Sequence, residues 1–397
     1  QNWDKSVRAQ DDFYQYACGG WMKNNPLPAA YSRFGSFDRL SLDNNKRINS
    51  ILTELQKGKY AKGTLEQKIS DLYKLAMDSV RRNAEGVKPV LPYLAEMEAC
   101  CDKSSLQALQ LKYAPFGFGL PFGAGCGADE KDSKNNIMNV YQGGLTLGQK
   151  EYYIDNDDAT TKIREEYKKY VVRMFRLFGF SWGEATAKME AIMRIETQYA
   201  IASKSKTELR DVEKNYNKMS LSDFEKNYPN LRFTQIENAE GVKTEYIQNL
   251  VVGQPEFLAA ADKVVAMMTA DELRAVMEWD VINGSTSLLS DEVASASFDF
   301  YGKIISGRKQ DYERWKKATS MVESVLGQAL GKMYCERYFP ESSKTRMKTL
   351  VANLQTSLGE RIMAQEWMSE DTKKAALDKL STFYVKIGYP DKWKDMS

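Results

Sequence analysis

Apolar residues recur at helical spacing through most of this chain, and that periodicity restricts the possible folds more than any other feature. One stripe follows the i, i+4, i+7, i+8 positions of a single helix face and consists of Leu65, Ile69, Leu72, Tyr73, Ala76 and Val80. Thr64 and Gln67 stand at the spacing of a capping box, in which side chains satisfy backbone N–H groups at a helix start. The segment therefore predicts a helix with one buried face.

The same pattern predicts helices over most of the sequence. Two more capping boxes are expected, one at Ser181 and Glu184 and the other at Thr269 and Glu272. The further predicted helices span 163–178, 181–203, 269–284, about 310–338, 343–366 and 370–384. A chain with so many periodic segments favours a mainly α fold.

One region departs from the helical pattern. Residues 116–144 alternate small and apolar side chains, turn at a charged tip and then resume with IMNVY. This pattern predicts a β-hairpin with a long loop at about 116–143. Its glycines match neither G-x-G-x-x-G nor the P-loop, so we do not expect phosphate binding there. The expected fold class is mainly α, a large multi-helix lobe that carries one small β-hairpin.

Charge and hydropathy exclude two classes of partner. The 397 residues include 56 Lys and Arg against 54 Asp and Glu, a net charge of +2, and no basic block indicates nucleic-acid binding. The longest apolar runs are far shorter than the roughly 18 residues that a membrane span needs. We therefore expect no nucleic-acid partner and no transmembrane segment in this chain.

Histidine is absent from all 397 residues. Its absence excludes a Ser-His-Asp triad, a Cys–His dyad and a His-bound zinc site within the chain. The cysteines show no C-x-x-C spacing, so a structural zinc site is not expected; they are Cys18, Cys100, Cys101, Cys126 and Cys335. We expect no catalytic residue and no metal ligand here.

Four segments carry a family resemblance. Residues 12–40 read DFYQYACGGWMKNNPLPAAYSRFGSFDRL and place an arginine and an aspartate among aromatic rings before a predicted helix. The others are NVYQGGLTLGQKEYYID at 139–155, ELRDVEKNYNKMSLSDF at 208–224 and KIGYPDKWKDMS at 386–397. In this order, from residue 11 to the end, they resemble the N-terminal part of the neprilysin and endothelin-converting-enzyme family of zinc metalloendopeptidases.

Members of that family fold as two lobes, a thermolysin-like catalytic lobe with H-E-x-x-H and a large helical lobe over the active-site cleft. The resemblance implies that this chain is the non-catalytic lobe, without the catalytic zinc lobe. Residues 1–40 would pack near the catalytic lobe, and residues 41–397 would form the covering lobe. Zinc would belong to the complete enzyme, and this chain alone is expected to be inactive.

The resemblance also implies a biological setting. The partners would be peptide substrates and the catalytic lobe of the same protein. The covering lobe would limit substrate size and add contacts on the primed side of the scissile bond. The location would be extracytoplasmic, which means periplasmic, secreted or anchored to a membrane through a segment outside this chain.

Three residues receive roles in substrate binding from the resemblance. Arg33 matches an arginine that contacts the primed side of the substrate, including a free C-terminal carboxylate, which a planar guanidinium can meet with two parallel bonds. Phe37 matches a pocket-lining aromatic, and Asp38 an aspartate of the same subsite. The residues alone offer other interpretations beside these. In these interpretations Arg33 would form a structural ion pair, and Phe37 would belong to the core. Asp38 would complement the helix dipole and hold Arg33 in place.

The signature Cys18-Gly19-Gly20-Trp21 is predicted to be structural. Trp21 is expected to pack, and the two glycines are expected to provide a turn. In the animal enzymes a cysteine at the position of Cys18 pairs with the catalytic lobe, and here it could do so only with a segment outside this chain.

Two further positions that form a disulfide in the animal enzymes are Ala76 and Ala318 here. Their joint replacement suits a bacterial-type member with fewer disulfides, and we expect their two helices to pack side by side. An alternative of another class is a non-enzymatic helical module that binds peptides or proteins. The presence or absence of H-E-x-x-H in the complete protein separates the two hypotheses.

Overall fold

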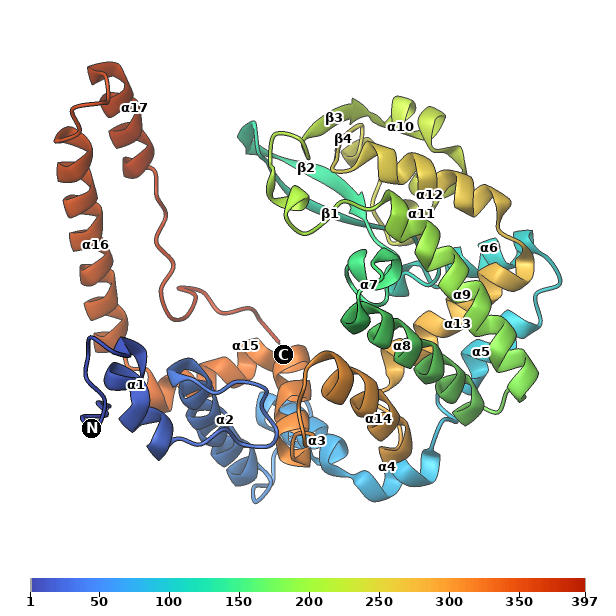
Figure 1. Cartoon of the computed structure of the whole chain (residues 1–397), viewed down its shortest axis with the longest axis horizontal. Helices are drawn as coiled ribbons and strands as arrows, with labels where there is room; N and C mark the ends of the chain where they lie inside the picture. The colour runs from blue at the N-terminus through green and yellow to red at the C-terminus, as the bar shows by residue number, and fades with distance from the viewer. Residues whose placement is uncertain (1, 397) are drawn as a thin grey trace. The chain divides into compact units, whose positions relative to one another are not determined.

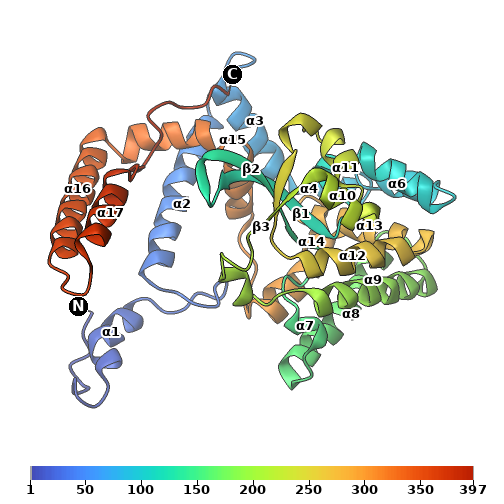
Figure 2. The ribbon, with the colours of Figure 1, turned by 90° about the horizontal axis from the view of Figure 1, so that it is seen from above.

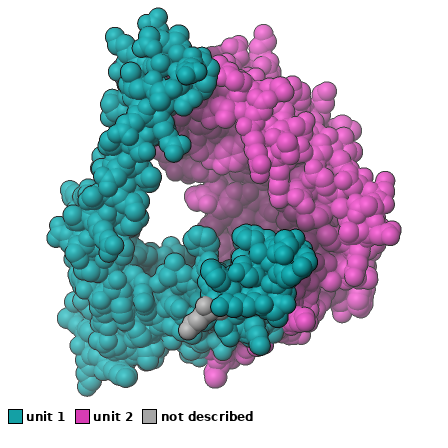
Figure 3. All heavy atoms as spheres, turned by 60° about the vertical axis from the view of Figure 1, so that its left-hand side comes forward, with its two compact units in different colours: residues 1–78, 311–397 teal, residues 79–310 magenta. Residues whose placement is uncertain are grey.

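The chain, seen here as a computed structural model that describes residues 2–396, divides into two compact units (Figure 1). Unit 1 comprises residues 1–78 and 311–397, and unit 2 comprises residues 79–310 (Figure 3). Unit 1 is thus assembled from both ends of the sequence, with unit 2 inserted between them. Residue 40, where the N-terminal segment was expected to end, lies inside a helix of unit 1.

The described part of unit 1 is helical. Its helices are α1 (Phe13–Asn24), α2 (Ser36–Leu55), α3 (Leu65–Met77), α15 (Arg314–Tyr338), α16 (Glu341–Met363) and α17 (Glu370–Ser381). The long helix α15 departs from helical dihedral angles at Leu326 (φ −120°, ψ 27°). The helices α16 and α17 run side by side in both ribbon views (Figures 1 and 2).

The core of unit 1 lies where α2, α3 and α15 meet. Its buried residues are Ile51, Leu52, Leu55, Ile69, Tyr73, Ala76, Ala318, Val322, Ala329 and Leu330. Ala76 and Ala318 are both in this cluster, and the Arg314 guanidinium donates from Nε to the Ala76 carbonyl oxygen (2.6 Å). The prediction that these two helices pack together is therefore confirmed.

The helix α16 buries little of its own surface. Among its described residues Lys344 is the buried one, whereas four apolar side chains at spacings of three and four are exposed: Met347, Leu350, Leu354 and Leu358. Such a stripe normally faces a packing partner.

Unit 2 is a helical assembly with one sheet. Its α-helices are α4 (Ser79–Glu85), α5 (Leu91–Glu98), α6 (Lys103–Lys112), α7 (Glu151–Ile154), α8 (Asp158–Leu177), α9 (Trp182–Ala202), α10 (Leu221–Asn227), α11 (Phe233–Ala239), α12 (Pro255–Met267), α13 (Ala270–Ser285) and α14 (Asp291–Ser297). Short 3₁₀ segments are η1 (Ala114–Phe116), η2 (Glu208–Arg210), η3 (Pro229–Leu231) and η4 (Thr244–Tyr246), and η5 (Phe298–Ile305) is a π-helix.

The predicted hairpin is present but starts later and belongs to a larger sheet. Strands β1 (Phe122–Asp129) and β2 (Asp132–Gln142) pair antiparallel, while the preceding residues form η1 and a loop. Two short strands complete the sheet in the order β1-β2-β4-β3, namely β3 (Asn217–Ser220) and β4 (Asn249–Val252). β4 runs parallel to β2 and antiparallel to β3. The fold is mainly α with one small sheet, as predicted.

The predicted helix starts are confirmed with one difference. Ser181 and Glu184 form a reciprocal capping box, as do Thr269 and Glu272. At α3 the Gln67 N–H donates to Thr64, but the Gln67 side chain accepts from Gly63 and not from Thr64 itself. Each arrangement satisfies N–H groups that a helix start leaves without intrahelical partners.

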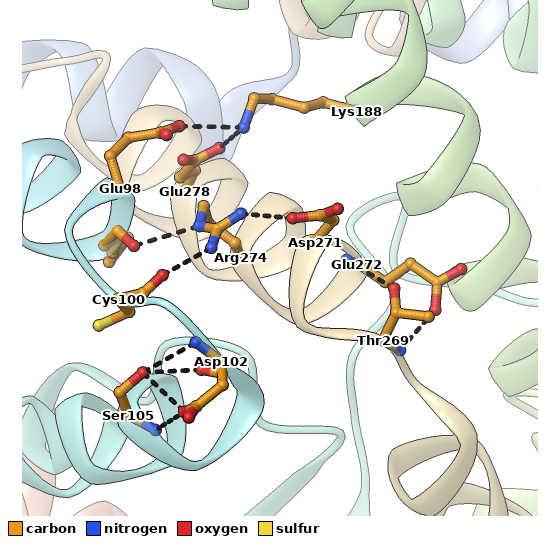
Figure 4. Close-up of polar contacts among 11 residues, drawn as sticks. Glu98, Cys100, Asp102, Ser105, Lys188, Thr269, Asp271, Glu272, Arg274 and Glu278 are labelled. Carbon is orange, nitrogen blue, oxygen red and sulfur yellow. Dashed lines mark hydrogen bonds and ion pairs between the residues drawn. The ribbon is translucent and has the colours of Figure 1, made fainter.

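A polar cluster joins α5, α9 and α13 in unit 2, and its Lys188, Arg274 and Glu278 side chains are largely buried (Figure 4). Lys188 Nζ donates to Glu278 (2.6 Å) and lies 3.4 Å from Glu98. The guanidinium of Arg274 donates to the carbonyl oxygens of Met97 (3.1 Å) and Cys100 (2.8 Å) at the end of α5. Burial raises the pKa of Glu278 to about 7. These contacts position the helix α13.

Candidate functional site

The signature residues near the start of the chain lie within helix α1. Cys18, Gly19, Gly20 and Trp21 are all inside Phe13–Asn24, so the predicted turn at the two glycines is wrong. Gly19 is buried, and a Cβ atom added there would lie 2.7 Å from Cβ of Asp4. Gly19 therefore permits the close approach of the preceding segment, a packing role that a Gly-Gly pair in the sequence does not distinguish from a turn.

Aromatic side chains pack against one another along the segment that connects α1 to α2. Trp21 stacks on Phe34 with ring centroids 6.3 Å apart, and Tyr31 meets Phe34 edge to face at 5.3 Å. The ring of Tyr31 also contacts Tyr312 at 5.7 Å. The predicted packing role of Trp21 is confirmed, and these contacts fix the backbone that leads to Arg33.

Asp38 stands in the first turn of α2. Its Oδ2 accepts a hydrogen bond from the Gly35 N–H (2.8 Å), which closes a capping contact and places a carboxylate at the positive end of the helix. The interpretation of Asp38 as a first-turn residue is confirmed. Within residues 2–396 no hydrogen bond or ion pair joins it to Arg33, so the structure gives no support to the idea that it holds that side chain.

Arg33 and Phe37 are both exposed. Within the described residues Arg33 has no hydrogen bond or ion pair, so the structural ion pair that was the alternative is not found. The guanidinium therefore offers its N–H donors to solvent. The side chain of Phe37 is 86% exposed, so the alternative interpretation of Phe37 as a core residue is wrong.

Phe37 lines a groove on unit 1. The groove has a volume of about 660 Å³ and is bordered by α2, α15 and residues 388–393. Tyr334 on α15 donates to the Asn44 side chain on α2 (2.8 Å), while Tyr389 and Trp393 stack with centroids 5.8 Å apart. Arg33 and Asp38 do not line the groove, so the structure places the three predicted residues in one short segment without joining them in one pocket.

The groove also depends on residues that sequence reasoning did not select. Lys344 is buried and donates from Nζ to the Tyr389 carbonyl oxygen and to Asp391 (2.8 Å each). It lies 4.2 Å from the centre of the Tyr389 ring, at cation–π distance. The signal that could have identified this wall is the aromatic segment KIGYPDKW, which was noted only for its resemblance.

The comparisons with known proteins identify the family. The sequence model of Peptidase family M13 matches residues 9–390. The chain belongs to peptidase family M13. Endothelin-converting enzyme 1 of Homo sapiens is 28% identical to this M13 chain over 397 residues, 98% of the chain and 51% of that protein. An endothelin-converting enzyme homolog of Locusta migratoria is 28% identical over 410 residues, 98% of the chain and 55% of that protein. This M13 chain spans about half the length of the curated relatives it matches.

Solved structures share the fold of this M13 chain. The zinc metalloprotease Zmp1 of Mycobacterium tuberculosis, in complex with an inhibitor, superposes with a TM-score of 0.92 at 28% identity, over the whole of this chain and 60% of that one. PepO from Lactobacillus rhamnosis matches with a TM-score of 0.87 at 22% identity, over 98% and 61% of the two chains. The resemblance noted in the sequence is confirmed, and the fold is that of the family's N-terminal lobe.

The zinc that the family implies does not fit the residues of this M13 lobe. The sequence has no histidine, and residues 2–396 contain no group of three or more Cys, Asp or Glu side chains that could hold a metal ion. Across the same residues, no helix has both the length and the apolar character needed to cross a membrane. The described side chains of the M13 lobe include a guanidinium without a partner (Arg33), an exposed ring (Phe37) and the groove on unit 1.

A second hollow of the M13 lobe lies entirely within unit 2. Its volume is about 770 Å³, and its walls come from α5, residues 116–120, residues 144–146, α9 and α13. Two acidic residues, Glu196 and Asp280, line it. This cavity could not be predicted from the amino-acid pattern, because its walls come from segments that lie far apart in the chain.

Proposed function

We propose that this chain is the N-terminal, non-catalytic lobe of a zinc-dependent metalloendopeptidase that cleaves peptides. In this proposal the lobe covers the active-site cleft, limits the size of substrates and adds contacts on their primed side. Zinc and the catalytic residues belong to the rest of the protein. The extracytoplasmic location is part of the same proposal and rests on the family resemblance.

The observation that carries the proposed substrate contact is the state of Arg33. Its segment is fixed by Phe34 packing and by the start of α2, yet its guanidinium has no partner within residues 2–396. An arginine that is ordered by its backbone and left unpaired suits an external carboxylate, because its planar fork can make two parallel bonds. Phe37, exposed at the rim of the groove, would contact the substrate side chain, and Asp38 would fix the segment.

The exposed stripe on α16 supports the proposed partner. Met347, Leu350, Leu354 and Leu358 leave an apolar helix face without cover in the described residues. Covering such a face removes apolar surface from water, at about 25 cal/mol for each Å². The catalytic lobe of the same protein is the partner that we propose for this face.

The test uses the intact enzyme and pairs of peptides that differ at their C-terminus. We expect Arg33→Lys to lower kcat/KM for peptides with a free carboxylate roughly ten- to a hundredfold, since a charge-assisted contact is worth about 1.5–3 kcal/mol. Peptides that are amidated there should lose much less. The melting temperature should not change, because the side chain is exposed.

Arg39→Lys is the matched control. Arg39 is also exposed, lies six residues further along the chain and pairs with Asp43 (3.2 Å). Its replacement should affect neither peptide class. An equal loss of activity on acid and amide peptides for Arg33→Lys would contradict the proposed role of Arg33. Absence of any chelator-sensitive peptide cleavage by the intact protein would contradict the proposed function as a whole.

A further inference from the structure

The cavity of unit 2 contains a carboxylate with neutral partners. Glu196 is 4% exposed and accepts hydrogen bonds from the hydroxyl groups of Thr146 (2.5 Å), Tyr153 (2.8 Å) and Tyr167 (3.0 Å). Within residues 2–396 no Lys or Arg forms an ion pair with it. Burial raises its pKa to about 7, although the three hydroxyl groups act in the opposite direction. A charge on Glu196 is therefore solvated by dipoles and left without a counter-ion.

A second carboxylate in the same cavity has a hydrogen-bond partner for only one of its two oxygens in the described residues. Asp280 on α13 accepts one hydrogen bond, through Oδ2, from the Gly119 N–H (2.7 Å). Its other oxygen, Oδ1, has no hydrogen-bond partner among the described residues, and this atom is not fully buried. Asp280 lines the cavity, so this oxygen faces the open volume. Burial raises the pKa of Asp280 to about 7 as well.

The loop that holds Asp280 is built for this contact. Gly119 adopts φ +72°, and a Cβ atom there would lie 2.9 Å from Met277 and from Gln110. A glycine is thus required both for the left-handed backbone and for the close packing that aims its N–H at Asp280. The contact accounts for one oxygen of Asp280 and leaves the second one free.

Aromatic rings form another part of the lining. Phe116 is 61% exposed and stacks on Phe118 with centroids 5.3 Å apart, and Tyr93 meets Phe116 edge to face at 6.5 Å. The remaining walls are mostly aliphatic, and no Lys or Arg is among the lining residues. The cavity therefore combines negative charge, ring faces and apolar surface, and its volume lies in the range of small-molecule sites.

We propose that this cavity binds a small organic cation, an ammonium group on an apolar body, with the ammonium beside Asp280 and Glu196. The ammonium supplies the counter-ion that both carboxylates lack, and it can donate to the free oxygen of Asp280. The apolar body replaces water against the aliphatic walls, and the rings attract the cation through their faces. A neutral ligand of the same shape would gain the apolar contacts alone.

The experiment measures binding of 2-phenylethylamine to the intact protein by isothermal titration calorimetry. 2-Phenylethanol is the neutral comparison, since it has nearly the same shape. We expect the amine to bind at least tenfold more tightly than the alcohol. Asp280→Asn keeps an acceptor for Gly119 but removes the charge, so it should abolish that preference. Asp271→Asn, an exposed position on the same helix and outside the cavity, should retain it.

A second variant keeps the test decisive if Asp280→Asn unfolds. Val276 lines the cavity from α13, and Val276→Phe should fill part of the volume and weaken the binding of both probes.

A peptide that begins with phenylalanine and its N-acetylated form then separate the possible sources of the cation. Preference for the peptide with a free amino group points to a peptide N-terminus, and binding of 2-phenylethylamine alone points to a free amine. Equal affinities for amine and alcohol, or amine binding that survives both variants, would overturn the proposal.

Discussion

Replacing Lys188 with methionine should show how strongly the interior of unit 2 disfavours a charge on Glu278. Glu278 is fully buried, and one of its oxygens, Oε1, has no hydrogen-bond partner in the described residues. The other accepts from Lys188 Nζ at 2.6 Å, and the Lys188 side chain is 15% exposed (Figure 4). Burial raises the pKa of Glu278 to about 7 even with Lys188 beside it.

The sign and size of the effect follow from that pKa. The ordinary value is 4.5, so the folded state holds the proton more tightly than the unfolded chain, and the free energy of unfolding falls as the pH rises from about 4.5 to about 7. A difference of this size corresponds to about 3 kcal/mol. Lys188→Met removes the charge and the hydrogen bond that lower the pKa of Glu278. The pKa then rises further, and the loss of stability continues above pH 7.

The assay is urea-induced unfolding of wild type and variant between pH 5 and pH 9. Near pH 5 Glu278 is protonated in both proteins, so we expect curves that nearly coincide. At pH 9 the variant should be less stable by up to about 2.7 kcal/mol, because one proton that the folded variant keeps from pH 7 to pH 9 changes the free energy of unfolding by at most about 1.4 kcal/mol per pH unit. The double variant with Glu278→Gln should recover most of that loss, because no charge remains to be buried.

Lys112→Met supplies the control on the surface. Lys112 pairs with Glu96 at 2.5 Å, but both side chains are largely exposed. Its removal should cost less than about 1 kcal/mol at every pH. A destabilisation by Lys188→Met that is equally large at pH 5 and pH 9 would refute the reasoning, since it would show that packing and not the Glu278 charge sets the cost.

Three further predictions concern packing, a cross-link and metal. Gly19→Ala should destabilise the protein by about 1–3 kcal/mol, because a Cβ atom there would clash with Asp4. Gly183 on α9 has open space where a Cβ atom would lie, so Gly183→Ala should be neutral or stabilising by up to about 1 kcal/mol. Thermal unfolding of the two variants tests both expectations. Cysteines at both Ala76 and Ala318 should form a disulfide on oxidation and stabilise unit 1 by about 2–4 kcal/mol, and thiols that stay free in the folded protein would contradict this. A chelator should leave the melting temperature of this 397-residue chain unchanged, since residues 2–396 hold no metal cluster; a clear drop would disagree.

Helical elements could be predicted because their signals are local. The stripe of α8 is an example: Tyr167, Tyr170, Val171, Met174 and Phe175 are all buried, as their spacing indicates. The box of Ser181 and Glu184 likewise fixed the start of α9 to the residue. A capping pair or a buried face needs only a few neighbouring residues, so one sequence contains the whole signal.

Features assembled from distant segments could not be predicted. The strands β3 and β4 have four residues each, and NKMS lacks the alternation that marks a half-buried strand. β4 pairs with β2, about 110 residues earlier in the chain, and β3 pairs in turn with β4, about 30 residues later. The candidate site shows the same limit. The family resemblance pointed to Phe37, whereas its groove partners Tyr334 and Trp393 come from the other end of the sequence.

The division of unit 1 between the two ends of the chain has a consequence for synthesis on the ribosome. The helices α2 and α3 emerge early, but the α15 face that completes their core follows only after all of unit 2. At about 5–20 residues per second, that delay amounts to roughly ten to fifty seconds. During it, Ile51, Leu52 and Ile69 lack the cover that α15 provides, so the nascent chain would expose a binding site for chaperones that the finished protein conceals.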